Sequence, residues 1–347
     1  MSSASTSSTV KEQELLEAAR GGDEDGFARL VEPHRGELHA HCYRMLGSAQ
    51  DAEDALQEAL TSAWRALPRF EGRSSLRSWL YKIATNACLK LIERRPARVL
   101  PIDYGPPTDP HDAPAEPLVE SVWVEPYPDA RLGLDASVAG PEARYEQRES
   151  VELAFIAALQ LLPPTQRAVL ILRDVLGFSG AEVADTLDTT PAAVYSALQR
   201  AHKTIDERLP AESQQATLRA LGDDRLRAIV AQYVDAWQDG DVDAVVALLA
   251  EDTTLTMPPR PTWYRGREAV ARFLRAYPLA SENRSRLVPT GASGQLAFGH
   301  YFWDAETQSF RPHGVNLLAL RGDRIVDITT FLTPEAFARF ELPAALA

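Results

Sequence analysis

The chain has few cysteines, no long hydrophobic run and no excess of positive charge. Its 347 residues include only two cysteines, Cys42 and Cys88. We therefore expect no disulfide framework, and so few cysteines fit a reducing cytoplasm. No apolar stretch suggests a membrane span, and the polar start MSSASTSSTV does not read as a signal peptide. The sequence also has no phosphate-cradling glycine loop and no nucleophile elbow, so we expect a cytoplasmic protein without metal or cofactor.

The net charge of −13 is distributed unevenly along the chain. Residues 1–95 carry −1, residues 96–149 carry −7, residues 150–209 carry −2 and residues 210–347 carry −3. The length predicts two or three domains, and a hydrophobic content of 45% supports packed cores. The expected organisation is a disordered tail at 1–10, helices at 11–95, an acidic proline-rich linker at 96–149, further helices at 150–209, a connector at 210–223 and a last domain at 224–347.

Two short helices joined by a tight turn are predicted between residues 162 and 209. Ser179 followed by Glu182 has the spacing of a capping box, and Thr190 with Pro191 is a typical helix start. Small and polar outward residues on the second helix are typical of a helix-turn-helix that enters a DNA groove. These outward residues are Ala192, Ala193, Tyr195, Ser196, Gln199, Arg200 and Lys203. The alternative is an ordinary helical hairpin; at a net charge of −2, the block should bind DNA poorly without a partner.

The N-terminal block contains an acidic helix followed by a strongly basic segment. Ser48 is expected to cap the helix, whose apolar stripe runs from Ala52 to Trp64. Its acidic and amide positions are Asp51, Glu53, Asp54, Gln57 and Glu58. Residues 65–98 then carry nine basic and two acidic side chains, interleaved with aromatic rings. That composition is typical of single-stranded nucleic-acid binding; the alternative is solvated arginines around core aromatics.

These two blocks resemble two regions of one protein family. The stretch DAEDALQEALTSAWRALPRFEGRSSLRSWLYKIATNACL resembles region 2 of an extracytoplasmic-function sigma factor. The stretch LPPTQRAVLILRDVLGFSGAEVADTL, followed by ALQRAHKTI, resembles region 4 of the same family. The blocks occur in the right order at about the right distance, which is far more specific than either block alone. The resemblance implies two all-α regions that direct core RNA polymerase to promoters.

The resemblance also implies roles for individual residues. The acidic helix would contact the clamp helices of the large polymerase subunit through Asp51, Glu53, Asp54, Gln57 and Glu58. The −10 element would be read by Arg69, Phe70, Glu71, Gly72, Arg73, Ser74, Ser75, Arg77, Tyr81, Lys82 and Asn86, with the loop 69–75 capturing a flipped base. The outward face of the helix-turn-helix would read the −35 element. There, Ala192, Ala193 and Tyr195 replace the more basic or polar residues common in the family.

The linker at 96–149 shows neither a helical nor a strand period. One interpretation is a disordered tether, although WVEPYPD is too aromatic for a pure spacer. In the family that the chain resembles, the corresponding linker passes through positively charged channels of the polymerase. A net charge of −7 suits that path, and this remains a hypothesis.

Residues 224–347 predict an α+β domain, with helices first and a curved antiparallel sheet after them. Residues 321–323 mark a tight hairpin turn. The phrases WYRGREAVARFL and RGDRIVDITTFL resemble the SnoaL-like, nuclear-transport-factor-2-like cone fold, which often encloses a pocket. Candidate pocket residues are Met257, Trp263, Tyr264, Tyr301, Trp303, Asn316, Asp327 and Phe331. An acid–base pair of Asp327 with His300 or His313 is the enzymatic interpretation; the alternative is a hydrogen-bonded aspartate at a strand end.

The sequence thus favours an alternative sigma factor that is not an enzyme and carries a regulatory SnoaL-like domain. The second interpretation is a small-molecule enzyme of the SnoaL-like type with a vestigial DNA-binding half. The expected partners are core RNA polymerase, through its clamp helices and flap, and promoter DNA. An anti-sigma protein and a small-molecule ligand are further candidates, and no membrane is expected.

Overall fold

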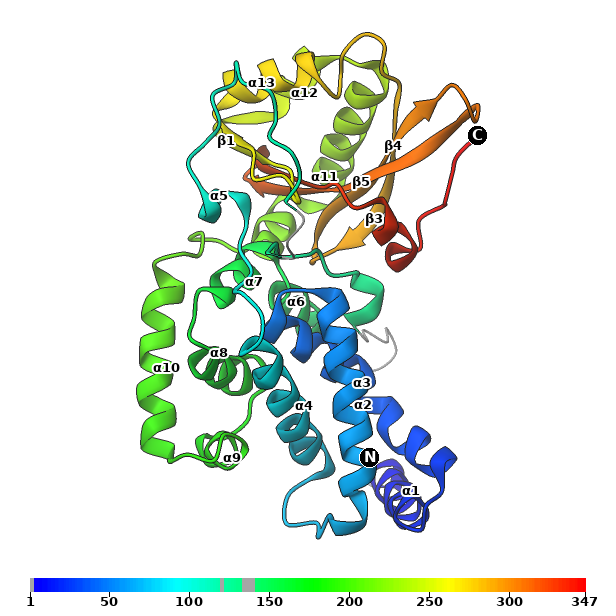
Figure 1. Cartoon of the computed structure of the whole chain (residues 1–347), viewed down its shortest axis with the longest axis vertical. Coiled ribbons are helices and arrows are strands. Elements are labelled where there is room, and N and C mark those ends of the chain that lie inside the picture. Colours follow the sequence, from blue (N-terminus) through cyan, green and yellow to red (C-terminus); the bar gives the residue numbers. More distant parts are fainter. Residues whose placement is uncertain (1–2, 119–121, 133–140) are drawn as a thin grey trace. The chain divides into compact units, whose positions relative to one another are not determined.

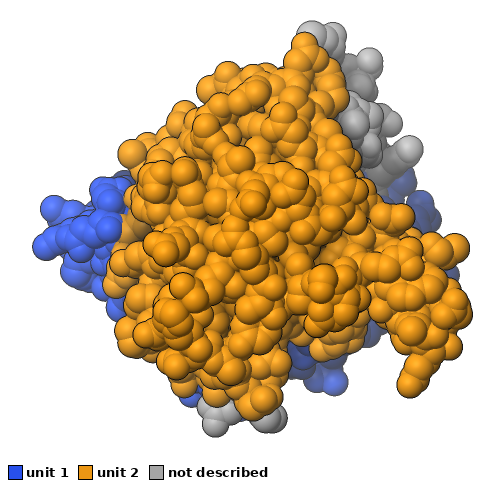
Figure 2. All heavy atoms as spheres, turned by 90° about the horizontal axis from the view of Figure 1, so that it is seen from above, with its two compact units in different colours: residues 1–97, 131–133, 159–207 blue, residues 98–130, 134–158, 208–347 orange. Residues whose placement is uncertain are grey.

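The computed structural model describes residues 3–118, 122–132 and 141–347, and the chain divides into two compact units (Figure 2). Unit 1 comprises residues 1–97, 131–133 and 159–207. Unit 2 comprises residues 98–130, 134–158 and 208–347. Within the described residues, no helix is both long and apolar enough to cross a membrane.

The N-terminal part of unit 1 is a bundle of four helices, α1 (Ser3–Arg20), α2 (Glu24–Leu46), α3 (Ala49–Ala66) and α4 (Leu76–Ile92), with a 3-10 turn η1 (Leu67–Arg69) after α3 (Figure 1). Gly47 ends α2 in the left-handed region at φ 68°, and the Ser48 hydroxyl then accepts the Asp51 N–H, as expected. Residues 3–10 belong to α1, in contrast to the expected disordered tail. Extending a helix that has already formed requires no new nucleus.

The second helical block of unit 1 contains α8 (Pro164–Leu170), a π-helical turn η3 (Ile171–Val175), α9 (Gly180–Thr186) and α10 (Pro191–Asp206). Both hydrogen bonds of the capping box are present: the Ser179 hydroxyl accepts the Glu182 N–H, and the Glu182 carboxylate accepts the Ser179 N–H. This confirms the prediction. Thr190 caps α10, and Pro191 occupies the first turn. Val194 and Ala201 on α10 are buried, so α9 and α10 form the predicted helix-turn-helix.

A buried arginine joins the two helical blocks within unit 1. The guanidinium of Arg167 donates to the carbonyl oxygens of Met45 at 2.5 Å, Gln160 at 2.9 Å and Leu162 at 3.2 Å. It also donates to the Gln160 side chain at 2.5 Å, and the Gln160 amide donates to the Arg44 carbonyl. Since carbonyl groups at the end of α2 have their partners on the second block, α8 is docked against α2.

Unit 2 contains a six-stranded sheet in the order β2-β1-β6-β5-β4-β3. The strands are β1 (Leu249–Thr256), β2 (Trp263–Arg265), β3 (Ser285–Ala292), β4 (Gln295–Asp304), β5 (Ser309–Arg321) and β6 (Arg324–Phe331). Only the β1–β6 pair in this described sheet is parallel. Gly322, at φ 57°, makes the expected turn between β5 and β6. The edge strand β3 was not predicted, because Pro289 and Gly291 interrupt its pattern, and an edge strand tolerates both.

Three helices pack on one face of this sheet: α11 (Gln214–Asp239), α12 (Val242–Leu248) and α13 (Arg267–Ala276) (Figure 1). The α+β fold is therefore confirmed. α11 begins inside the expected connector and kinks at Gly222, whose φ is 71°. A short 3-10 segment, η4 (Pro334–Phe340), contributes Phe337, which packs edge-on against Tyr301 at 5.1 Å.

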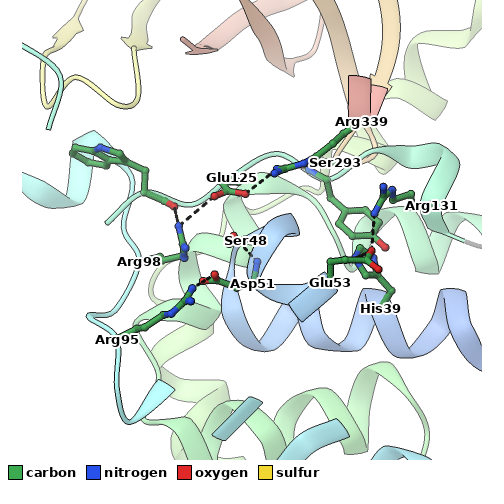
Figure 3. A network of polar contacts seen from close by, with 12 residues as sticks. His39, Ser48, Asp51, Glu53, Arg95, Arg98, Glu125, Arg131, Ser293 and Arg339 are labelled. Atoms are coloured by element: carbon green, nitrogen blue, oxygen red, sulfur yellow. Dashed lines mark hydrogen bonds and ion pairs between the residues drawn. The ribbon is translucent and has the colours of Figure 1, made fainter. Parts of the chain in front are cut away.

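The described residues of the linker are divided between the two units, in contrast to the disordered tether that was one interpretation: those of 98–130 and 141–149 belong to unit 2 with the sheet domain, while 96–97 and 131–132 belong to unit 1. They include α5 (Pro101–Tyr104) and η2 (Asp129–Leu132), and α6 (Pro141–Glu149) and α7 (Leu153–Gln160) follow. Trp123, Val124 and Tyr127 are buried, and the Tyr127 N–H donates to the Ser293 hydroxyl at 3.0 Å. Glu125 lies between Arg98 and Arg339, at 3.5 Å from each (Figure 3). The WVEPYPD motif offers enough apolar area to order this part of the chain.

Candidate nucleic-acid interface and ligand cavity

The outward face of α10 is open to solvent. All seven residues expected to read the −35 element are exposed, and Tyr195 retains 56% of its accessible surface. The Tyr195 ring also lies close to the start of α9. A Cβ at Gly180 would lie 3.0 Å from the Tyr195 hydroxyl, so this glycine permits the close approach. The face that could enter a groove therefore presents Arg200 and Lys203 together with small residues near the helix start.

The loop expected to capture a −10 base is anchored by its aromatic residue. Phe70 is buried, and its ring lies 4.8 Å from the ring of Trp79. Arg20 donates to the Phe70 carbonyl oxygen. The remaining loop residues are exposed, and Gly72 adopts a φ of 73°. These exposed residues are Arg69, Glu71, Gly72, Arg73, Ser74 and Ser75. In this structure Phe70 positions the loop and does not lie on its surface.

Two residues of α4 expected to face DNA are held within unit 1. Tyr81 is buried, and burial raises the pKa of its hydroxyl, which donates to Glu37 at 3.3 Å. The guanidinium of Arg77 lies over the rings of Tyr81, at 5.0 Å, and Phe178, at 4.8 Å. Arg77 also pairs with Glu37 at 3.3 Å. These contacts differ from the outward placement expected for Arg77 and Tyr81, because the second helical block supplies Phe178 as a packing partner.

The ammonium group of Lys82 is also engaged within unit 1. It donates to the Asp185 carbonyl oxygen at 2.5 Å and lies 3.1 Å from the Asp188 carboxylate. Ser78, one helical turn before it, lies 3.5 Å from the Glu182 carboxylate of α9. Asn86, one turn further along α4, is half-buried. The face of α4 that the resemblance assigns to the −10 strand is therefore covered by α9 in this structure.

Of the five residues of α3 expected to contact polymerase, two form ion pairs within the protein (Figure 3) and three are exposed. Asp51 is buried and pairs with Arg95. Glu53 pairs with Arg131 at 3.0 Å and lies 3.5 Å from His39. Burial lowers the pKa of His39 to about 4, so that histidine is neutral at neutral pH. The other three expected polymerase contacts, Asp54, Gln57 and Glu58, are exposed. Sequence reasoning did not identify Arg95 and Arg131 as partners, because those pairs depend on tertiary contacts.

Unit 2 contains a cavity of about 430 Å³ between the sheet and the helices α11 and α13. Its wall is mostly apolar and includes Trp237, Leu255 and Phe273, while Ala113 and Pro114 of the linker also line it. The lining residues with polar side-chain groups include Arg260, Tyr277, Asn283, His300, His313 and Thr330. A volume of this size is in the usual range for small-molecule sites.

One of the eight expected pocket residues lines this cavity. Met257 lines the cavity, but Trp263, Tyr264, Tyr301, Trp303, Asn316, Asp327 and Phe331 do not. The reason is strand alternation, since successive side chains point to opposite faces. On β4, His300 and Phe302 face the cavity, so Tyr301 and Trp303 point to the other side of the sheet.

The proposed acid–base pair is not assembled. The Asp327 carboxylate accepts hydrogen bonds from Thr254, its neighbour on β1, and from Thr329 at 2.7 Å. It does not line the cavity that His300 and His313 face. Burial raises the pKa of Asp327 and lowers that of His313 to about 4. Asp327 is therefore a hydrogen-bonded aspartate of the sheet, the alternative interpretation of its position.

Comparisons with known proteins give the family of this chain. Residues 30–97 match Sigma-70 region 2, residues 152–205 match Sigma-70 region 4, and residues 230–328 match the SnoaL-like domain. The chain is 40% identical over 336 residues to the ECF RNA polymerase sigma factor SigG of Mycobacterium tuberculosis H37Rv, covering 94% of this chain and 86% of that protein. It is 31% identical to the RNA polymerase sigma-H factor of Pseudomonas aeruginosa, over 57% of this chain and 94% of that protein.

A solved structure has the same arrangement of folds. The crystal structure of the M. tuberculosis extracytoplasmic function sigma factor SigJ aligns with a TM-score of 0.54 at 23% identity. The alignment covers 89% of this chain and 97% of that one. Two sigma regions in order, a SnoaL-like domain after them and a relative similar along nearly the whole length lead to one conclusion: the chain belongs to the extracytoplasmic-function family of RNA polymerase sigma factors.

Proposed function

We propose that the chain directs core RNA polymerase to promoters, with α10 reading the −35 element and α4 with its preceding loop reading the −10 element. The observation that carries this proposal is the exposed face of α10 on a complete helix-turn-helix, in one unit with the basic loop of region 2. In this proposal Asp54, Gln57 and Glu58 make the first contact with the polymerase clamp, since they are exposed on α3. Asp51 and Glu53 join that contact after Arg95 and Arg131 release them.

Reconstituted transcription tests this proposal. Purified core RNA polymerase with the full chain should initiate at defined start sites, mapped on genomic templates. Substitution of Asp54 and Glu58 by asparagine and glutamine should weaken polymerase binding. A matched pair, Glu12→Gln with Glu14→Gln on α1, should have little effect. No start site beyond those of core polymerase alone would refute the function itself.

The covered face of α4 implies a step before promoter recognition. Lys82 and Arg77 are only partly exposed, because α9 and Phe178 lie against them and compete with a DNA strand for the two cations. We infer that regions 2 and 4 separate when the polymerase binds, which frees the −10 surface. A polymerase that supplies this separation would also explain how a helix-turn-helix block with a net charge of −2 remains on DNA.

The C-terminal domain is proposed to regulate initiation and not to catalyse a reaction. Its candidate acid, Asp327, is bonded within the sheet and does not line the cavity. The regulatory proposal predicts that removal of residues 222–347 alters transcript yield in the reconstituted assay. Identical yields with and without the domain would refute regulation but would leave promoter recognition intact. Because the proposed work is transcription, the cytoplasm is the expected compartment.

A further inference from the structure

The lining of the cavity in unit 2 is mostly apolar and includes Trp237, Leu274 and Phe302. Arg260 is the cationic lining residue, and no aspartate or glutamate is among the described residues that line the space. Asp112, which precedes the linker residues of the wall, is exposed and does not line the cavity. An apolar chamber with a cation and no lining anion suits a molecule with an apolar body and one negatively charged end.

The other polar side chains that line the cavity carry no charge at neutral pH. His300 donates to or accepts from Ser285 at 3.2 Å, and burial lowers its pKa well below the usual value. Burial and the neighbouring Arg260 charge lower the pKa of His313 to about 4. Both imidazoles are therefore neutral at neutral pH. The amide of Asn283 already donates to the Tyr277 carbonyl at 2.7 Å. Arg260 is the group left to bind an anion strongly.

One wall of the cavity comes from the segment that joins the two sigma regions. Residues 105–118 lie along the loop between β1 and β2, and two of them, Ala113 and Pro114, line the cavity. The contacts that hold this segment involve its backbone. The Gly105 carbonyl accepts from the Trp263 indole, and the Thr108 N–H donates to the Trp263 carbonyl at the start of β2. The N–H groups of Ala115 and Leu118 donate to the loop. Most of the segment is exposed, so little apolar burial opposes its opening.

Arg260 connects the segment to the cavity. Its guanidinium donates to the Ala115 carbonyl oxygen at 2.6 Å, while the Ala115 N–H donates to the Thr262 hydroxyl at 2.8 Å. A carboxylate bound to Arg260 would compete with a neutral carbonyl for the same donors, and the charged acceptor forms the stronger hydrogen bond. Occupancy of the cavity and the position of residues 105–118 are therefore coupled through one side chain.

We propose that this cavity binds a small apolar molecule that carries a carboxylate, and that residues 105–118 of the linker form its lid. Arg260 holds the carboxylate, and the apolar body lies between α11, α13 and β4. The lid belongs to the sigma linker, so a molecule bound in the C-terminal domain alters the segment that connects regions 2 and 4. This assignment does not depend on how promoters are read.

Binding to the full chain tests the site. The probes are 2-naphthoate and decanoate, with 2-naphthamide as the neutral analogue of the first, and titration calorimetry measures their affinity. At least one carboxylate should bind saturably, and Arg260→Met should weaken that binding about tenfold or more, since it removes the charge-assisted bonds. Arg272→Met, at an exposed position of α13, is the matched control and should leave affinity unchanged. Binding of 2-naphthamide should be the same in the wild type and both variants.

Three outcomes would overturn the site. They are no saturable binding of either carboxylate at millimolar concentration, equal weakening by Arg260→Met and Arg272→Met, and equal affinity for naphthoate and naphthamide. Folding of each variant is checked by its thermal transition, and Arg260→Lys, which keeps the charge, should restore part of the affinity if Arg260→Met proves unstable. Promoter recognition is measured separately, so a failure here is distinguishable from a failure of the sigma function.

Hydrogen exchange tests the lid. The amides of Ala115 and Leu118 donate to the β1–β2 loop, that of Thr108 donates to the Trp263 carbonyl at the start of β2, and all three report whether the segment is closed. Saturating carboxylate should change their exchange rates, while amides of α12, none of whose residues lines the cavity, should be unaffected. Thr262→Val removes the acceptor of the Ala115 amide and should accelerate its exchange and the association of the probe. Binding that leaves all three amides unchanged would refute the lid.

Discussion

The helices α4 and α10 are both proposed to contact promoter DNA, but the structure places them in different situations. On α10 the seven candidate residues are exposed, and Arg200 and Lys203 face solvent. On α4 the candidate cations are engaged, since Arg77 lies over two aromatic rings and Lys82 contacts Asp185 and Asp188. One proposed DNA surface is thus exposed in the free chain, while the other is covered by α9 and would have to be released first.

This difference follows from where each helix lies in unit 1. α10 forms the outer helix of its block and buries one stripe through Val194, Ala201 and Ile205. α4 buries Leu76, Leu80 and Ala84 and also carries the contact with α9. A protein that exposes both surfaces at once would present competing DNA sites without the polymerase. We propose that release of α4 is a controlled step, and the four predictions below test it.

The largest effect is expected from Arg167→Met, which removes the donor that docks α8 against α2. Three buried backbone carbonyls lose their partner, so the free energy of unfolding of unit 1 should fall by about 3 kcal/mol. Urea denaturation, followed by exchange of the α8 amides, measures this loss. Arg200→Met on α10 removes an exposed arginine and should be nearly neutral. Equal stability of the two variants would mean that Arg167 does not hold the blocks together.

Acidification should loosen the α4 side of unit 1. His41 is buried, bonds to Thr85 at 2.9 Å and packs against the Tyr81 ring, and burial lowers its pKa to about 3. Because the unfolded chain takes up this proton near pH 6.5, stability is retained above that pH and lost as the pH falls toward the folded value. The linkage relation gives a loss of about 2 kcal/mol between pH 7.5 and 5.

Exchange of the α4 amides at the two pH values measures that loss. His41→Gln should remove about half of the dependence, because His39 on the same helix, whose pKa burial also lowers to about 4, continues to titrate. The control is His202→Gln on α10, an exposed histidine, which should retain the wild-type dependence. A pH dependence that His41→Gln leaves intact would assign the effect to other groups.

Substitutions on α10 should act without any prior release. Arg200→Ala and Lys203→Ala should each weaken the polymerase–promoter complex by about 1 kcal/mol and reduce its salt slope by about one. Filter binding of the reconstituted holoenzyme over a range of salt concentrations measures both quantities. Unchanged salt slopes would exclude phosphate contacts by these two residues.

The smallest effect is expected from the contact between α4 and α9. Asp185→Asn with Asp188→Asn removes two exposed carboxylates beside Lys82, and exposed pairs contribute about 0.5 kcal/mol. Binding of a single-stranded −10 oligonucleotide by the free chain should then rise about twofold. The matched control, Asp206→Asn with Glu207→Gln, changes net charge equally at the end of α10. An equal rise in both variants would show a general charge effect and no release of α4.

Local signals predicted much of the fold because they depend on neighbours in the chain. The capping box at Ser179, the helix start at Thr190 and the turn at Gly322 are each decided within a few residues, and all three are present. The cavity was less predictable. Alternate residues of β4 point to opposite faces of the sheet, and only the tertiary packing decides which face meets α11 and α13. The prediction chose Tyr301 and Trp303, whereas His300 and Phe302 line the cavity.

By itself, the sequence determined the helix ends, the helix-turn-helix, the two sigma regions and the α+β character of the C-terminal domain, because capping, periodicity and motif spacing are short-range properties. Only the tertiary structure decided that α9 covers α4, that Arg167 joins the helical blocks, and that residues 105–118 close a cavity in unit 2. Those contacts join residues far apart in the chain, and their energies depend on burial and on partners that no local pattern specifies.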